Sequence, residues 1–379
     1  MILIAVERRA SDIFIDPTPS GAYTVRMRID GTLRQVLEIN PSNARMVIST
    51  VKVVSMMDIT EHRRPQDGAF SARVNNQQIS FRTASVGAYA GEKVALRLLG
   101  SASGPRSLSD LGLAPDDREA IEKAIRLPSG MVLMCGPTGS GKTSTLYAML
   151  KSIDYTLKNV ISIEDPIENV MPNISQMEVN PRAGITFAQL LRNSLRQNPD
   201  IICLGEIRDE ETAEIAVQAA QTGHLIIATV HSNDNLGTVD RLQNLGVPLR
   251  TIAATLHVII SQRLVRTLCP HCKKKIELPD DLKNYFVNAG LPTDNVHAPV
   301  GCPRCDGTGF SGRRAVFDIM VVNKHLRDLL EKDGTTIAAI QDFIEREHGS
   351  SIMSYKGYVL VSQGVCPLEE VERIAMNME

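Results

Sequence analysis

The sequence predicts an α/β protein whose larger part is a parallel sheet with helices on both faces. From about residue 113 onward, short continuous apolar runs alternate with amphipathic segments of helical spacing. Strands that are buried on both faces appear as unbroken apolar runs, because neither face meets water. One of these runs leads directly into a glycine-rich turn and a helix. Before residue 100 the pattern is different: apolar and polar residues alternate on either side of turn-forming residues. This pattern predicts a small α+β unit in front of the sheet.

The small α+β unit is predicted from two hairpin signals and one helical segment. Asp30-Gly31 and Asn75-Asn76 are turn-forming pairs, and each is flanked by alternating apolar and polar residues. Apolar residues at helical spacing lie between the two pairs. The expected elements are hairpins over 24–39 and 71–85, a helix over 43–57 and a strand over 91–99. A segment rich in Gly, Ser and Pro follows, and it predicts a linker.

The parallel sheet is predicted from four apolar strands that alternate with helices. The expected strands are 131–136, 159–165, 200–206 and 225–231, and the expected helices are 143–153, 186–197 and 211–223. A segment with paired cysteines follows, and amphipathic helices continue to the end. The predicted organisation is a small domain at 1–100, a linker at 101–112, a sheet domain at 113–265, a cysteine-rich subdomain at 266–315 and a helical subdomain at 316–379.

The strongest chemical signal is a complete P-loop motif, G-x-x-x-x-G-K-[ST], between a predicted strand and a predicted helix. Its backbone N–H groups and the helix N-terminus suit phosphate oxygens. Lys142 is expected to reach the β- and γ-phosphates of ATP, and the Thr143 hydroxyl to ligate Mg²⁺. The alternative, a glycine-rich turn that fits by chance, is disfavoured by the match and its context. The predicted nucleotide-binding residues here are Gly136, Pro137, Thr138, Gly139, Ser140, Gly141, Lys142, Thr143 and Ser144.

Two further strands end in carboxylates that this chemistry needs. Glu206 ends the apolar strand 200–206 and is predicted to hold Mg²⁺. Glu164 and Asp165 end the strand 159–165 and are candidates to orient or deprotonate the attacking water. A turn or capping role for Asp165-Pro166 is the alternative for that pair.

Histidines and arginines near these strands are candidates for sensing or neutralising phosphate charge. His224 and His231 flank the apolar run LIIATV (225–230), which suggests a γ-phosphate sensor or a relay. Arginines of this region could neutralise transition-state charge within the chain or from a neighbouring subunit. For Arg192 and Arg196, which share one helix face, a solvated surface is an equally good interpretation. The candidate arginines are Arg192, Arg196 and Arg208.

Four of the seven cysteines form two C-x-x-C pairs, which predict a structural zinc site. Cys269 and Cys272 are separated from Cys302 and Cys305 by 29 residues. Two such pairs at this spacing can close a tetrahedral Zn²⁺ site that leaves no open position for catalysis. A redox-active C-x-x-C is the alternative, but two pairs in one chain disfavour it. This clustering also favours a reducing, cytoplasmic compartment.

The composition excludes several classes of protein. Lys and Arg number 41 against 43 Asp and Glu, for a net charge of −2, so a large basic surface for nucleic acid is not expected. Aromatic residues make up 4% and Trp is absent, which leaves little for stacking on bases. No stretch resembles a secretory signal or has the roughly 20 apolar residues that span a bilayer.

These motifs together resemble the type II secretion and type IV pilus assembly ATPase family, in the branch of general secretion pathway protein E and pilus assembly protein B. The resemblance covers nearly the whole chain in family order. It rests on RASDIFIDP (9–17), RIDG (28–31), RRPQDG (63–68), GEKVALRLL (91–99), GPTGSGKT (136–143), SIEDPIE (162–168), LRNSLRQNPDIICLGEIRDEETA (191–213), AAQTGHLIIATVHSND (219–234) and the two CPxC pairs.

The resemblance implies a RecA-like ATPase core preceded by a PAS-like domain, and roles for particular residues. Glu164 corresponds to the family's Asp box, Glu206 to Walker B, and His224 and His231 to the His box. Arg82 and Arg97 occupy positions whose family counterparts reach toward the nucleotide. Two positions depart from the family. Phe14 replaces a His, so no polar interaction is expected from that side chain, and Asn198 replaces an Asp before Pro199.

The resemblance also implies a function. We expect an ATP-hydrolysing homo-hexameric motor for pseudopilus or pilus assembly in type II secretion, at the inner face of the bacterial cytoplasmic membrane. Its partners would be an inner-membrane platform protein and a membrane adaptor, although the family's usual adaptor-binding N-terminal domain has no counterpart in these 379 residues. The cysteine pairs favour extension over retraction. The alternatives are type IV pilus extension, DNA uptake, a DNA-processing RecA-like motor and a non-catalytic scaffold.

Overall fold

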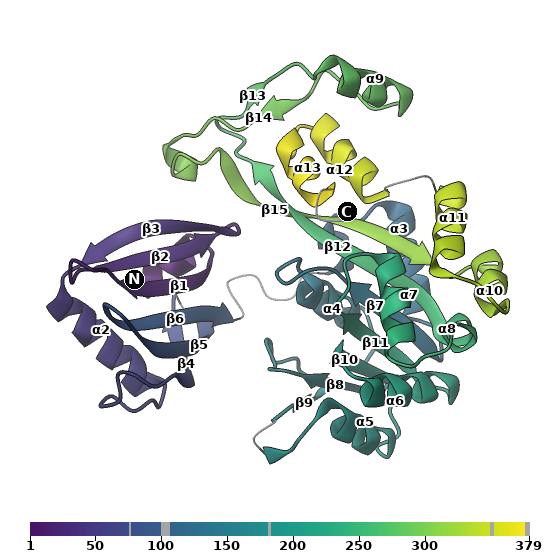
Figure 1. Cartoon of the computed structure of the whole chain (residues 1–379), viewed down its shortest axis with the longest axis horizontal. Coiled ribbons are helices and arrows are strands. Elements are labelled where there is room, and N and C mark those ends of the chain that lie inside the picture. Colours follow the sequence, from purple (N-terminus) through teal and green to yellow (C-terminus); the bar gives the residue numbers. More distant parts are fainter. Residues whose placement is uncertain (76, 100–106, 181–182, 349–351, 376–379) are drawn as a thin grey trace. The chain divides into compact units, whose positions relative to one another are not determined.

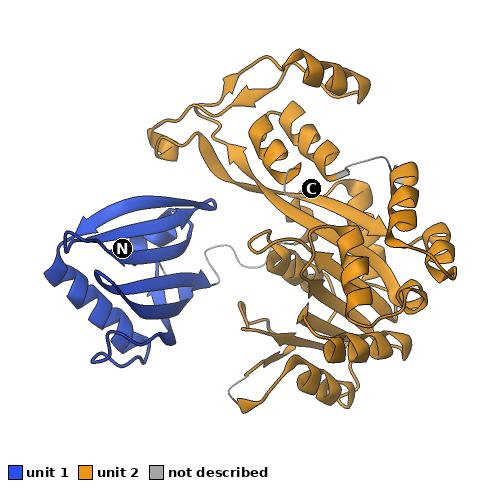
Figure 2. Cartoon of the chain, viewed as in Figure 1, with its two compact units in different colours: residues 1–104 blue, residues 105–379 orange. Residues whose placement is uncertain are grey.

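The chain folds into two units, residues 1–104 and 105–379, which are coloured separately in Figure 2. The computed structural model describes residues 1–75, 77–99, 107–180, 183–348 and 352–375. Half of the predicted linker, residues 101–106, therefore lies outside the described residues, as does Asn76 of the second predicted turn. Among the described residues, no helix is both long and apolar enough to cross a membrane.

The first unit is a six-stranded antiparallel sheet in the order β3-β2-β1-β6-β5-β4, with two helices (Figure 1). Asp30 and Gly31 both have positive φ, as the predicted turn requires. Alternate residues of the strands face one apolar cluster that also receives residues of α2. The elements are α1 (Ile2–Glu7), β1 (Ala10–Pro17), β2 (Tyr23–Ile29), β3 (Thr32–Ile39), α2 (Pro41–Val54), β4 (Gln66–Val74), β5 (Gln77–Ala88) and β6 (Gly91–Leu99).

The second unit contains a seven-stranded sheet in the order β15-β12-β7-β11-β10-β8-β9, parallel except for β15. This confirms the predicted α/β class. Its first half comprises η1 (Leu108–Leu111), α3 (Pro115–Ala124), β7 (Gly130–Cys135), α4 (Lys142–Lys151), β8 (Val160–Glu164), β9 (Ser175–Glu178), α5 (Phe187–Leu195), β10 (Ile201–Ile207), α6 (Glu210–Gln221), β11 (Leu225–Val230), α7 (Asn235–Asn244) and α8 (Leu249–Thr255).

The second half begins with the long strand β12, and the cysteine-rich segment follows it. Its elements are β12 (Leu256–Leu268), β13 (Lys274–Lys275), α9 (Asp280–Asn288), β14 (His297–Ala298), η3 (Pro303–Cys305), β15 (Phe310–Val321), α10 (Lys324–Glu331), α11 (Ile337–His348), α12 (Ile352–Ser362) and α13 (Leu368–Ala375).

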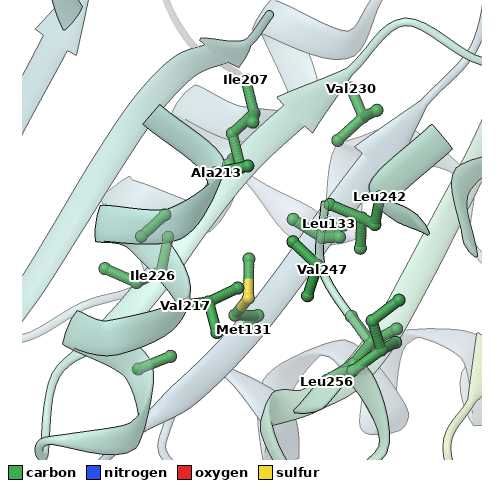
Figure 3. Packing of buried hydrophobic residues seen from close by; sticks show 14 of the residues in the cluster. Met131, Leu133, Ile207, Ala213, Val217, Ile226, Val230, Leu242, Val247 and Leu256 are labelled. Carbon is green, nitrogen blue, oxygen red and sulfur yellow. The ribbon is translucent and has the colours of Figure 1, made fainter. Parts of the chain in front are cut away.

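Helices cover both faces of this sheet, and the strands divide their side chains between them. Met131 and Leu133 of β7 face one apolar cluster, whereas Val132 and Met134 face the other. The first cluster is closed by α5 to α8 with α10 and α11, and Figure 3 shows part of it. The second is closed by η1, α3 and α4. This burial on both sides is the reason that the strands are continuous apolar runs.

Two strands run through positions at which the sequence suggests subdomain boundaries. β12 passes 265/266 and β15 passes 315/316, and the two pair antiparallel from Val258↔Val321 to Leu268↔Phe310. The cysteine-rich segment is thus inserted between two paired strands of the sheet (Figure 1). The boundaries at these positions remain a prediction, but the secondary structure is continuous across both.

Candidate functional site

The glycine-rich turn lies where β7 ends and α4 begins. Gly136, Gly139 and Gly141 have φ angles of 137°, 80° and 91°, a region in which residues with a Cβ are strained. A Cβ at Gly136 would also lie 2.5 Å from the carbonyl oxygen of Gln262. The turn therefore requires glycine, and it places the amino end of α4 where its N–H groups and dipole favour an anion.

The Lys142 side chain folds back over this turn. Its ammonium donates to the carbonyl oxygens of Gly136 at 2.6 Å and Pro137 at 3.0 Å. Burial is the main reason that the pKa of Lys142 is lowered. A phosphate at the turn would replace these neutral acceptors with negative charge, which stabilises the ammonium more strongly.

Glu206 lies near the carboxyl end of β10, two strands from β7 in the sheet. Glu206 is 7% exposed, and its carboxylate lies 2.7 Å from His231 Nε2 and accepts from the Arg208 guanidinium. Arg208 also reaches Asp165 Oδ2 at 3.5 Å. The hydrogen bond to Glu206 raises the pKa of Arg208. The negative charge of Glu206 also slightly opposes the lowering of the Lys142 pKa.

Glu164 ends β8, the strand next to β10, and its carboxylate is 5% exposed. Three side chains donate to it: the Tyr147 hydroxyl, Ser162 Oγ at 2.7 Å and Gln176 Nε2 at 2.9 Å. Tyr147 comes from α4, the helix that follows the glycine-rich turn. Glu164 is therefore a fixed buried carboxylate on the same edge of the sheet as Glu206.

The other predicted residues lie in several places. Arg192 pairs with Glu211 at 2.7 Å, and both are about half exposed. Arg196 bonds the Asn193 side chain at the end of α5. His224 precedes β11 at its amino end, where Nδ1 lies 3.1 Å from the carbonyl oxygen of Ala219. A six-residue strand of about 20 Å separates it from His231, so within one chain His224 does not join the glycine-rich turn.

Arg82 and Arg97 belong to the first unit. They are partners across β5 and β6, so their side chains share one face of that sheet. Arg97 Nε donates to Asp12 Oδ1 at 3.0 Å. Their predicted part in nucleotide binding stays a prediction.

Arg263 of β12 is a residue of this region that the motifs missed. It is 4% exposed, it donates to the Asn233 carbonyl oxygen at 2.5 Å, and its buried Nε has no partner among the described residues. Together with Pro137 to Ser140 it lines a cleft of about 400 Å³. The polar pair Gln262-Arg263 inside a long apolar strand is the sequence signal that could have identified it.

The four paired cysteines converge on one point. Their ligand atoms all lie within 4.8 Å of one another, and Sγ–Sγ distances are 4.0 Å for Cys269–Cys302, 3.8 Å for Cys272–Cys305 and 3.7 Å for Cys302–Cys305. Tetrahedral zinc with Zn–S bonds of about 2.3 Å separates its sulfurs by about 3.8 Å. The N–H groups of Cys302 and Gly309 also point at Cys305 Sγ, at 3.2 Å each. The donor set therefore fits zinc.

Comparison with known proteins identifies close relatives over the whole chain. The Type II/IV secretion system protein family matches residues 1–373. The type IV pilus assembly ATPase PilB of Pseudomonas aeruginosa is 38% identical over 383 residues, which is 100% of this chain and 66% of that protein. The type II secretion system ATPase E of Vibrio cholerae is 37% identical over 372 residues, 98% of this chain and 73% of that protein.

A solved structure agrees with the fold. The crystal structure of the pilus retraction motor PilT with bound ADP has a TM-score of 0.67 and 25% identity, and it covers 98% of this chain and 95% of its own.

Proposed function

The chain belongs to the Type II/IV secretion system protein family, and from this premise we propose that it is a homo-hexameric ATPase that drives pseudopilus assembly in type II protein secretion. Membership makes it an ATPase of a secretion or pilus machine. The choice of secretion, the ring and the residue roles are our proposal. Type IV pilus extension and DNA uptake are the alternatives within the same motor class.

The observation that carries the proposal is the convergence of Lys142, Glu206 and Glu164 at one edge of the sheet. The turn 136–143 would hold the phosphates of ATP, with Lys142 leaving its carbonyl partners for the β- and γ-oxygens. Thr143 and Glu206 offer the hard oxygen donors that Mg²⁺ prefers. The magnesium ion would neutralise charge on the phosphate oxygens.

Three other side chains would act on the transferred phosphoryl group. Glu164, fixed by three donors, would orient the attacking water, with Glu206 as the alternative base. Arg208 lies against Glu206 and Asp165, within the same site, and would neutralise spreading charge. His231 would sense the γ-phosphate from its contact with Glu206.

The exposed arginines of α5 suit contact with a neighbouring subunit. We propose that Arg192 and Arg196 act across the ring interface, where their exposed side chains would exchange their present partners, Glu211 and Asn193, for the negative charge of the nucleotide. Arg82 and Arg97 would contribute from the first unit, and His224 would act only on a nucleotide held elsewhere in the ring. The platform and adaptor proteins of the cytoplasmic membrane would be the partners, and zinc at the four cysteines would be structural.

The direct test is Lys142→Ala. We expect ATP turnover to fall about 100- to 1000-fold, because a charge that stabilises the transition state is worth about 3–4 kcal/mol. Lys151→Ala, at the exposed end of the same helix, is the matched control. Phosphate release and circular dichroism would be measured on each. Turnover at the wild-type rate in folded Lys142→Ala protein would refute the proposal.

A further inference from the structure

Tyr147 is a buried side chain that connects the glycine-rich turn to Glu164. It lies on α4, four residues after Thr143, and is 1% exposed. Its ring packs in the apolar cluster beneath the helix. Its hydroxyl leaves that cluster to donate to Glu164 Oε2 and to accept from the N–H of Asn169 at 3.1 Å. One hydroxyl thus joins the helix, the end of β8 and the loop that follows it.

The remaining partners of Glu164 close this network from the other side. Ser162 and Gln176 both donate to Oε1, whereas Tyr147 is the only described residue that donates to Oε2. Gln176 also donates to the Asn169 carbonyl oxygen at 2.9 Å and accepts from the Met171 N–H at 2.6 Å. The loop after Glu164 is therefore folded back and held by the same groups that hold the carboxylate.

The arrangement leaves the carboxylate able to bind one water. A carboxylate has about four acceptor positions, and three are used by the described side chains. The unused position is on Oε2, the oxygen whose orientation depends on Tyr147. Burial, then the hydrogen bond to Glu164 and its charge, raise the pKa of Tyr147, so the hydroxyl keeps its proton and remains a donor.

We propose that Tyr147 is a positioning residue for ATP hydrolysis: it holds Glu164 Oε2 in the orientation that aligns the attacking water and couples that orientation to the position of α4. The inference rests on the proposed function. Because the amino end of α4 would bind the phosphates, a shift of the helix on nucleotide binding would be transmitted to the carboxylate through one rigid aromatic side chain.

The test is Tyr147→Phe in the full chain, with Tyr155→Phe as the matched control. Tyr155 follows the same helix and donates to the Leu150 carbonyl oxygen at 2.5 Å, away from Glu164. We expect kcat to fall about 10- to 100-fold in Tyr147→Phe, since hydrogen bonds to charged groups and small misplacements have effects of this size. KM for ATP should stay within about twofold, because the phosphate-binding turn is unchanged.

A further readout separates positioning from packing. In a double-mutant cycle with Glu164→Gln, the two losses should be strongly non-additive.

The outcomes distinguish this inference from the proposed function. An active wild type, with Tyr147→Phe equal to Tyr155→Phe in kcat, would overturn the inference alone. Additive losses in the cycle, or a fall in unfolding temperature without a fall in kcat, would do the same. If the wild type, like Lys142→Ala, hydrolysed no ATP, the proposed function would be overturned and the inference with it.

Discussion

At the scale of single residues, the buried carboxylates of this protein are each held by a particular set of donors. A carboxylate removed from water is stable only when it is paired or hydrogen-bonded. Glu370, for example, is buried between Arg266 and Arg373. Glu92 of the first unit lies 2.7 Å from the Lys52 ammonium, and Lys52 is only 1% exposed. Removing one partner of such a pair leaves a charge without compensation.

We therefore expect Glu92→Gln to destabilise the first unit by about 3 kcal/mol at neutral pH. Urea unfolding followed by circular dichroism would measure this. Glu38→Gln, an exposed position on β3 of the same unit, is the control and should change little. Equal stability of the two variants would contradict a role for the buried pair.

The same variant gives a prediction for pH. Burial alone would raise the pKa of Glu92, but hydrogen bonds from Lys52, Ser85 and His62 outweigh it and lower that pKa below its usual 4.5. The stability that Glu92 contributes is then complete above about pH 4.5 and lost as the pH falls through the folded-state value. The difference in the free energy of unfolding between the wild type and Glu92→Gln should therefore become smaller below about pH 4.5.

At the scale of elements, β12 and β15 carry the cysteine cluster. β12 pairs with β7 from Leu256 to Ser261, and beyond that point it pairs with β15 alone. The two strands leave the sheet as a ribbon that ends next to Cys269 (Figure 1). Arg266 of this ribbon lies 4.0 Å over the Phe310 ring and binds Glu370 of α13. The cluster is thus joined to the sheet through the strand that also carries Arg263.

We expect about one zinc ion per chain. Cys302→Ser should lose this ion, and the segment between Cys269 and Gly309 should then become disordered. Elemental analysis and limited proteolysis would measure the two effects. Cys366→Ala is the control, because this buried cysteine lies in the neighbouring apolar cluster and outside the four-cysteine group. Full zinc content in Cys302→Ser would show that the four thiols do not act together.

At the scale of the whole molecule, the proposed motor needs more than one chain. The first unit carries the exposed pair Arg82 and Arg97, and the second carries the proposed nucleotide site and the exposed Arg192 of α5. A ring built from head-to-tail contacts would present the arginines of one subunit to the nucleotide of another. Opening and closing between units would then follow hydrolysis.

We expect ATP with Mg²⁺ to raise the mass measured by sedimentation from that of one chain, 41.5 kDa, toward six times that value. The reason is that the charge of the nucleotide would link neighbouring subunits. The same experiment with ADP, and with Lys142→Ala, provides the controls and should show less assembly. A single-chain mass under every nucleotide condition would contradict the ring.

Much of this protein was predictable because its signals are local. The P-loop, the four cysteines, the Asp30-Gly31 turn and the apolar strands are each defined by neighbours in the chain, so backbone preference and residue chemistry suffice to place them. The predicted fold class and family are confirmed, and the four predicted strands and three predicted helices of the sheet begin and end within a few residues of their predicted bounds. The sheet also contains β9, β12 and β15, which the sequence did not predict.

The tertiary structure decided what depends on residues far apart in sequence. Tyr147 meets Glu164, and Arg263 meets the turn at Gly136, only because strand order places β8 and β12 beside the elements that carry their partners. The sequence by itself determined the chemistry and the class of this ATPase. Packing decided which side chains share a site, because contact across a sheet is set by topology rather than by spacing along the chain.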